Sequence, residues 1–208
     1  MITVSIVEDH AGTRRSLENL LADASGFQLL HAYANGEEAF RGMTAAQPDV
    51  ALVDINLPVM SGIDCVRKLK IPFPALKVLM LTTYEESELI FDSLRAGASG
   101  YLLKKMAATE LLPAIEQVHA GGAPMTMQVA RKVVDHFHKI QQTASEMQRL
   151  TPREQETLAL LAKGFLYKEI GDKLSVSVNT VKRHLHAIYE KLHVQSRTEA
   201  TAKYLNGA

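Results

Sequence analysis

The chain has 208 residues, of which 47% are hydrophobic, and its 23 basic residues balance 23 acidic ones. This length fits one large domain or two small ones, and the composition excludes a disordered chain. The single cysteine, Cys65, excludes an internal disulfide and a cysteine-based zinc cluster, and it fits a reducing compartment.

The charge is unevenly distributed along the chain. Residues 1–120 carry ten Lys or Arg against fifteen Asp or Glu, a net of −5, whereas residues 149–208 carry ten against six, a net of +4. This asymmetry indicates that the carboxyl-terminal part meets a polyanion, although a solvated surface is the alternative. No apolar stretch approaches the ~20 residues that span a bilayer and no signal-peptide pattern is present, so we expect a cytoplasmic protein without a membrane partner.

Strand-like and helix-like patterns alternate over the first 120 residues. Short β-branched, apolar runs predict strands at Ile2–Val7, Phe27–Tyr33, Val50–Val53, Leu76–Leu81 and Gly100–Leu103. Helical spacing of apolar residues predicts helices at Thr13–Asp23, Glu37–Ala46, 61–69, Glu85–Ala96 and Ala108–Ala120. Five such pairs predict an α/β fold, a doubly wound five-stranded parallel sheet with right-handed crossovers.

Three acids follow two of the most apolar strands. Glu8 and Asp9 come directly after the first strand, and Asp54 ends the run Val50–Val53. Parallel strands deliver their carboxyl ends to one sheet edge, where open α/β sheets bind ligands. Carboxylates brought together there raise one another's pKa unless a hard cation balances them, so we predict an Mg²⁺ site formed by Glu8, Asp9, Asp54 and the carbonyl of Asn56. For Asp54 alone, a helix-cap or turn role is the alternative.

Two further strands end in groups that suit phosphoryl chemistry. Thr82 follows the fourth strand and Lys104 the fifth. Asp54 can attack a phosphoryl group, while Lys104 neutralises the transferring oxygens and the Thr82 hydroxyl hydrogen-bonds one of them. Taken singly, Thr82 reads as a turn residue and Lys104 as surface charge. Their joint placement at strand ends favours the functional interpretation.

With these residues, 1–120 resemble the receiver domain of bacterial two-component response regulators. The resemblance implies that Glu8 and Asp9 hold Mg²⁺ and that Asp54 accepts phosphate from a sensor histidine kinase. It also implies that Thr82 and Tyr101 form a switch in which Tyr101 packs inward on phosphorylation. Many receivers have proline after the active-site lysine, whereas Lys105 stands here, as in the subgroup joined to helix-turn-helix outputs.

Paired glycines and a proline at 121–124 break the fifth helix, and we interpret residues 121–148 as a linker that contains a short helix, Val129–Ile140. From Leu150 the pattern is helical. Thr151, Pro152 and Glu154 form a strong helix start, and further helices are predicted at Tyr167–Leu174, 177–192 and Arg197–Tyr204.

The third of these helices has two unlike faces. Its apolar face consists of Val181, Leu185, Ile188 and Leu192. The outer face carries Asn179, Lys182, Arg183 and His186, with Thr180 and His184 at its flank. Such a face can enter the DNA major groove, where Arg, Lys and Asn read base edges and flanking groups meet phosphates. An ordinary solvated helix face is the alternative.

Residues 149–208 resemble the LuxR-type helix-turn-helix of NarL/FixJ response regulators. The segments that carry this resemblance are 150–154, 168–170, 177–184, 191–192 and 197–200. Gly171 stands where that family commonly has alanine, a change expected to cost under ~1 kcal/mol of helix propensity. The resemblance implies a DNA-binding domain of four helices in which Arg197–Tyr204 contacts a second copy.

Together, these features predict a transcription regulator and not an enzyme. In the resting state the receiver is expected to mask the DNA-binding helices or to hold the chain monomeric. Phosphorylation of Asp54 is expected to release or dimerise it, and the dimer reads two half-sites in double-stranded DNA roughly one helical turn (~34 Å) apart. One rival is a phosphatase like the haloacid-dehalogenase hydrolases, but its general acid would fall at Asn56, which has no proton to give in that role. A second rival is a constitutive DNA-binding protein with a vestigial receiver.

Overall fold

A computed structural model gives the fold of residues 1–207, and for residues 106–108, 139–144, 206 and 207 it describes the backbone alone. The chain forms two compact units. Unit 1 comprises Met1–Val133, and unit 2 begins at Val134.

Unit 1 is built on a five-stranded parallel sheet with the strand order β2-β1-β3-β4-β5. The strands are β1 (Ile2–Val7), β2 (Phe27–Tyr33), β3 (Val50–Val53), β4 (Lys77–Thr82) and β5 (Gly100–Leu103). Strands β3 and β5 are buried along their whole length, as strands covered on both faces must be. The predicted α/β fold is therefore confirmed.

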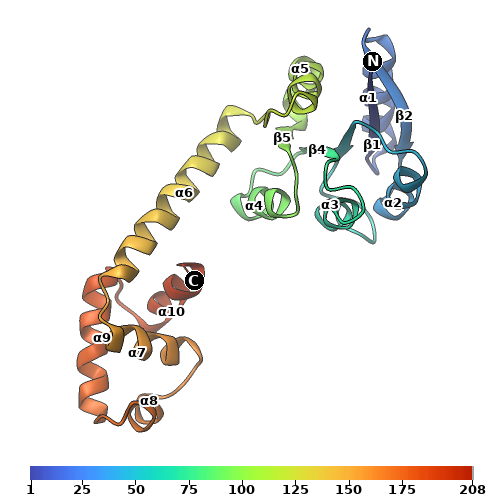
Figure 1. The fold of residues 1–208 in the computed structure, drawn as a ribbon. Coiled ribbons are helices and arrows are strands. Elements are labelled where there is room, and N and C mark those ends of the chain that lie inside the picture. The colour runs from blue at the N-terminus through green and yellow to red at the C-terminus, as the bar shows by residue number, and fades with distance from the viewer. Residues whose placement is uncertain (208) are drawn as a thin grey trace. The chain divides into compact units, whose positions relative to one another are not determined.

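Helices cover both faces of this sheet (Figure 1). One layer is formed by α2 (Gly36–Ala45), α3 (Gly62–Lys70) and α4 (Ser87–Arg95), and the other by α1 (Ala11–Asp23) and α5 (Ala107–His119). Each layer encloses its own apolar core against the sheet. Cys65 is fully buried in the first of these cores, as a small apolar filler would be.

Two helices of unit 1 begin two residues away from their predicted starts, whereas α2, α3 and α5 begin within one residue of theirs. Helix α1 starts two residues early because His10 caps it, with Nδ1 accepting from the Thr13 amide at 3.2 Å. Helix α4 starts at Ser87 instead of Glu85, because the preceding loop is bonded to its surroundings. The Tyr84 amide donates to the Thr82 hydroxyl at 3.3 Å, and the Tyr84 carbonyl accepts from the Tyr101 hydroxyl at 2.9 Å.

The segment after α5 returns along β5. The Tyr101 amide donates to the Pro124 carbonyl at 2.9 Å, and Tyr101 forms a parallel bridge with Met125. Helix α6 (Met127–Gln148) then runs for 22 residues, where we predicted a helix over Val129–Ile140 only. The prediction was too short because residues 141–148 are polar, yet they contain neither glycine nor proline and several are good helix formers. The domain boundaries at 120 and 148 stay a prediction.

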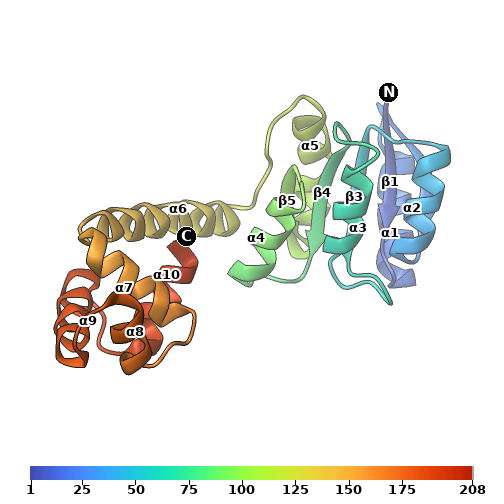
Figure 2. The same ribbon diagram turned by 60° about the horizontal axis from the view of Figure 1, so that its bottom comes forward.

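Unit 2 is helical (Figure 2). After the end of α6 it contains α7 (Pro152–Ala162), α8 (Tyr167–Leu174), α9 (Val178–Leu192) and α10 (Arg197–Gly207), which extends beyond the predicted end at Tyr204. The predicted capping box is present: the Thr151 hydroxyl accepts from the Glu154 amide, and the Glu154 carboxylate accepts from the Thr151 amide. These helices enclose a core to which α7, α8, α9 and α10 all contribute.

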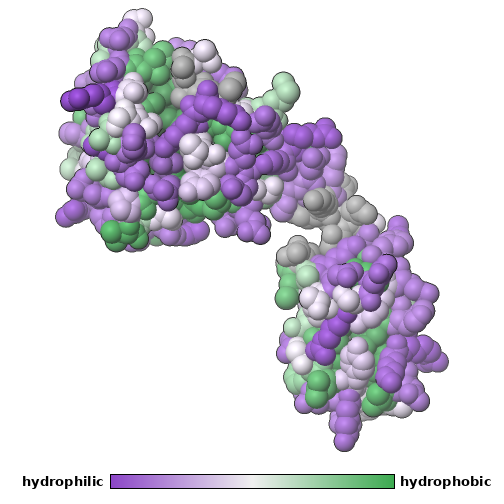
Figure 3. Space-filling model, turned by 180° about the vertical axis from the view of Figure 1, so that it is seen from behind, coloured by the Kyte–Doolittle hydropathy of each residue, from purple (hydrophilic) through white to green (hydrophobic). Residues whose placement is uncertain are grey.

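Within the part of the chain that the structure describes, no helix combines the length and apolarity needed to cross a bilayer. The face seen in Figure 3 is mostly hydrophilic on both units, and hydrophobic residues form small patches on it.

Candidate functional site

The three acids predicted from separate strand ends come together in unit 1. Glu8, Asp9 and Asp54 each offer a carboxylate oxygen, and these oxygens lie within 4.8 Å of one another. Glu8 and Asp54 are buried, whereas Asp9 is exposed, so the cluster opens to solvent on one side. Three oxygen ligands with solvent access fit a hard divalent cation that keeps part of its water shell.

Lys104 connects two of these acids. Its Nζ donates to Asp54 Oδ2 at 2.8 Å and lies 2.7 Å from Glu8 Oε2. The Lys104 side chain is only 18% exposed, so it is not the ordinary surface charge of the alternative interpretation. The Lys104 ammonium attracts both carboxylates and so holds Glu8 and Asp54 close together. It can also donate a hydrogen bond to an oxygen of a group bound at Asp54.

The pKa values at the cluster follow from this arrangement. Burial raises the pKa of Glu8, and the charge of Asp54 adds to this effect, while Lys104 opposes it. Burial acts to lower the pKa of Lys104, but its bonds to Asp54 and Glu8 prevail and the pKa is raised. Lys104 is thus held in its charged form.

The backbone around Asp54 is fixed from both sides. The Asp54 amide donates to the Val7 carbonyl at 2.9 Å, and its Oδ1 accepts from the Ile55 amide at 2.8 Å. Helix α3 is capped by Ser61, so Asp54 is not a helix cap. Asn56 is exposed in the loop that follows, and the role predicted for its carbonyl stays a prediction.

Two residues that support the cluster were not predicted as site residues. A Cβ at Gly62 would lie 1.8 Å from the Asp54 carbonyl oxygen, so only glycine allows the loop to fold back over Asp54. Arg14 Nη1 donates to the carbonyls of Glu8 at 2.7 Å and Asp9 at 3.1 Å, which fixes the acidic turn. In the sequence, Gly62 indicates only the start of a helix, and no sequence pattern indicates a role of Arg14 in the site.

Thr82 and Tyr101 meet through the loop before α4. Thr82 is fully buried at the end of β4, and its hydroxyl accepts from the Tyr84 amide. Tyr101 is also fully buried, with its hydroxyl on the Tyr84 carbonyl. Burial raises the pKa of the Tyr101 hydroxyl, so this group remains a donor. The ring of Tyr101 lies inside in this structure, and the switch predicted for Thr82 and Tyr101 stays a prediction.

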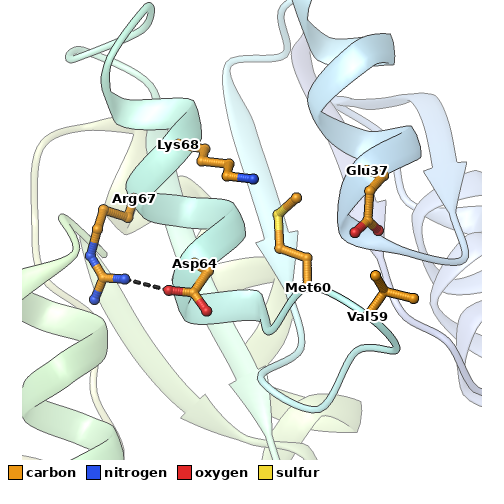
Figure 4. A pocket seen from close by; sticks show the side chains of 6 residues that line it. All are labelled: Glu37, Val59, Met60, Asp64, Arg67 and Lys68. Atoms are coloured by element: carbon orange, nitrogen blue, oxygen red, sulfur yellow. Dashed lines mark hydrogen bonds and ion pairs between the residues drawn. The ribbon is translucent and has the colours of Figure 1, made fainter.

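A pocket of about 340 Å³ lies between α2 and α3 (Figure 4). Glu37 projects into it from α2, and Asp64, Arg67 and Lys68 come from α3. Arg67 forms an ion pair with Asp64, so the charges of these two lining residues neutralise each other. The pocket contains none of the predicted site residues.

In unit 2 the two faces predicted for the helix that became α9 are confirmed. Val181, Leu185, Ile188 and Leu192 are buried. The predicted DNA-contacting residues lie on the other side: Asn179, Lys182, Arg183 and His186 are exposed, and Thr180 and His184 are partly exposed. Ser177 caps the helix, with its hydroxyl accepting from the Thr180 amide at 3.1 Å. The exposed face is therefore polar and cationic.

Buried polar contacts hold α9 in place. Lys191 Nζ donates to Glu154 Oε2 at 2.7 Å and so joins the end of α9 to the start of α7. Burial acts to raise the pKa of Glu154, but the bonds from Lys191 and Thr151 prevail and the pKa is lowered. A Cβ at Gly171 would lie 2.8 Å from the Val176 carbonyl oxygen, so the turn between α8 and α9 passes close to this glycine.

Comparisons with known proteins identify the family of each part of the chain. The family described as "Response regulator receiver domain" matches residues 4–116, and the family described as "Bacterial regulatory proteins, luxR family" matches residues 148–204. The chain is 36% identical to the transcriptional regulatory protein LnrK of Bacillus subtilis over 208 residues, which covers 96% of this chain and 94% of LnrK.

Two further relatives extend this picture. The DNA-binding transcriptional activator DevR/DosR of Mycobacterium tuberculosis is 32% identical, with 96% of this chain and 92% of the relative covered. A crystal structure of a LuxR-family two-component response regulator from an Aurantimonas species matches with a TM-score of 0.62 and 28% identity, covering 65% of this chain and 96% of that one. The chain belongs to the two-component response regulators that join a receiver domain to a LuxR-type DNA-binding domain, and it is a transcription regulator.

Proposed function

We propose that a phosphoryl group on Asp54, received from a sensor histidine kinase, controls how this regulator dimerises and binds its promoters. The observation that carries the proposal is the contact of Lys104 with both Asp54 and Glu8, beside the exposed Asp9. Phosphoryl transfer needs a nucleophile, a fixed positive charge and an acid that can bind a cation from solvent. Asp54, Lys104 and Asp9 bring these groups together.

In the proposed reaction an oxygen of Asp54 attacks the phosphorus atom of a phosphohistidine. The new bond joins that oxygen to phosphorus, the bond from phosphorus to the histidine nitrogen breaks, and the electron pair leaves with the imidazole. Charge on the transferring oxygens is balanced by Lys104, which exchanges part of its contact with Glu8 and Asp54 for the phosphoryl group. The Thr82 hydroxyl, whose oxygen accepts from the Tyr84 amide in this structure, donates its proton to a phosphoryl oxygen.

Glu8, Asp9 and Asp54, with the Asn56 carbonyl, would hold Mg²⁺. The cation supplies positive charge to the phosphoryl oxygens during transfer. The donor set supports this assignment, because three carboxylate oxygens within 4.8 Å repel one another and a single ammonium offsets only part of that charge.

The proposed DNA contacts lie on the exposed face of α9. Lys182 and Arg183 can each donate to guanine in the major groove, and Asn179 can bond adenine. His186 lies on the same face, whereas Thr180 and His184 lie at its edge, where phosphates pass. Pairing of two copies through α10 would present two such helices to half-sites roughly one helical turn (~34 Å) apart.

The first step is tested by incubating the full chain with Mg²⁺ and a small acyl phosphate, followed by intact mass, peptide mapping and size measurement. We expect one added phosphoryl group on Asp54 and a shift from monomer to dimer. The Asp54→Ala variant is expected to show neither. A phosphoryl group on another residue, or a size that does not change, would contradict the proposal.

The phosphatase alternative is tested in the same preparation. Asn56, two residues after Asp54, offers no acidic proton for a leaving group. We therefore expect slow hydrolysis of a single aspartyl phosphate and no turnover of an aryl phosphate. Sustained turnover that Asp54→Ala abolishes would favour the phosphatase.

A further inference from the structure

The loop between β4 and α4 is tied to three other parts of unit 1. The Tyr84 carbonyl accepts from the Tyr101 hydroxyl at 2.9 Å. The Glu85 carboxylate pairs with Lys105 Nζ at 2.6 Å. The Glu85 carbonyl accepts from Lys132 Nζ, which comes from the second turn of α6. The last of these bonds joins the loop to the helix that leaves the domain.

The first turns of α6 are themselves anchored on unit 1. Val129 is 1% exposed and lies in the core shared by α2, α3 and α4, and Val133 packs against the same core. The segment before α6 is bound to β5 through the Pro124 carbonyl. From this anchor the helix continues without interruption to Gln148, which belongs to unit 2.

The same loop begins at the switch residue. The Thr82 hydroxyl accepts from the Tyr84 amide at 3.3 Å, only one residue before the carbonyl that Lys132 bonds. If the Thr82 side chain rotates toward a phosphoryl group on Asp54, its oxygen moves away from the Tyr84 amide. The next two peptide units carry the carbonyls that hold the Tyr101 hydroxyl and Lys132, so a shift of this loop would displace the carbonyl that Lys132 bonds.

We propose that Lys132 is a positioning residue that latches the start of α6 to this loop in the resting state and is released when Asp54 is phosphorylated. The inference rests on the proposed function of Asp54 and extends it along the chain. The latch converts a movement of one hydroxyl into a change at the start of the helix that connects the two units.

A contact made in one state only shifts the equilibrium between the two states when it is removed. Removing the Lys132 ammonium therefore favours the phosphorylated conformation in the absence of phosphate. Linkage is reciprocal, so the variant must also bind a phosphoryl analogue at Asp54 more tightly by the same factor. Lys132 is partly exposed, and one hydrogen bond of ordinary net strength predicts an effect of about three- to tenfold.

The test measures the affinity of the full chain for beryllofluoride at saturating Mg²⁺ by calorimetry. The latch variant is Lys132→Met, which keeps the length of the side chain without the donor. Lys132→Arg keeps a cationic donor, and Lys68→Met removes an exposed lysine on α3 as a matched change of charge. Lys132→Gln serves if Lys132→Met does not fold.

We expect Lys132→Met to bind beryllofluoride about three- to tenfold more tightly than the wild type, and Lys132→Arg and Lys68→Met to bind like the wild type. Hydrogen exchange of amides 127–133 should accelerate on beryllofluoride binding in the wild type, and it should be fast in Lys132→Met without the ligand. A purely structural lysine would lower the unfolding temperature and leave the affinity unchanged, and that result overturns the latch.

The two proposals fail in different ways. If wild-type binding of beryllofluoride does not depend on Asp54, the proposed function is wrong and the latch fails with it. If the wild type binds through Asp54 and Lys132→Met has the same affinity, the latch alone is wrong.

Discussion

At the scale of single residues, the ammonium of Lys104 balances two buried carboxylates at once. Replacing it in Lys104→Met leaves Glu8 and Asp54 side by side without a cation. Loss of one partner from a buried ion pair costs about 3 kcal/mol, so we expect the free energy of unfolding of unit 1 to fall by about that amount without divalent cations. Urea unfolding with and without Mg²⁺ measures this loss.

Mg²⁺ should restore more stability to Lys104→Met than to the wild type, because the cation then has no ammonium to compete with. The control is Lys105→Met, which removes an exposed ion pair with Glu85 and should cost at most about 1 kcal/mol. Equal losses in the two variants would show that Lys104 does not hold the acids together.

The site residues that could be predicted are those that directly follow an apolar strand in the sequence. Glu8, Asp54, Thr82 and Lys104 each follow an apolar strand, and parallel strands end at one edge of a sheet. Gly62 and Gly171 could not be predicted, because their role is the close approach of a distant carbonyl oxygen. For Gly171 the sequence suggested only a small loss of helix propensity, whereas in this fold alanine would press on the Val176 carbonyl.

At the scale of elements, the bond between Lys191 and Glu154 links α9, the helix proposed to read DNA, to α7. The pKa of Glu154 is lowered in the folded chain from an ordinary value of 4.5. A carboxylate with a lowered folded pKa stabilises the fold above its unfolded pKa, and this stability is lost as the pH falls through the folded pKa.

We therefore expect Glu154→Gln to be less stable than the wild type at pH 7, by about 1–3 kcal/mol. The difference between the two should shrink as the pH falls from about 5 toward about 3. Thermal unfolding across this range measures it. Glu156→Gln, which removes an exposed pair with Arg153, is the control and should follow the wild type. A stability gap that stays constant with pH would disprove the role of the Glu154 charge.

The exposed face of α9 supplies a second prediction at this scale. Lys182→Ala should weaken binding to specific double-stranded DNA by about 1–3 kcal/mol, because one donor to a base edge is lost. The control is Lys163→Ala, which removes an exposed lysine at the end of α7. Affinity and footprint that are the same for Lys182→Ala and the wild type would remove Lys182 from the reading face.

The bounds of the helices show which features of the fold the sequence does not predict. The buried stripe of α9 and the capping box of α7 were predictable, because periodicity and caps are local properties. The start of α4 was not, since the Tyr84 loop is held by Tyr101, which lies 17 residues further along the chain. The polar second half of α6 also gave no periodic signal of a helix.

At the scale of the whole molecule, helix α6 joins an acidic receiver part to a basic part of the LuxR type. Residues 1–120 carry a net charge of −5 and residues 149–208 a net of +4. The receiver part is thus ill suited to DNA, and under the proposed function a phosphoryl group on Asp54 acts on DNA binding through a change in conformation or assembly. Coupling of this kind between two sites typically changes an affinity by about 5- to 150-fold.

The most direct test measures the affinity of the full chain for a DNA fragment selected from a random double-stranded library, with and without prior incubation with Mg²⁺ and an acyl phosphate. Phosphorylation of the wild type should tighten binding at least about fivefold, and Asp54→Ala should bind with the same affinity in both conditions. A wild type whose affinity is unchanged by phosphorylation, or an Asp54→Ala variant that responds like the wild type, would contradict the central claim that Asp54 controls DNA binding.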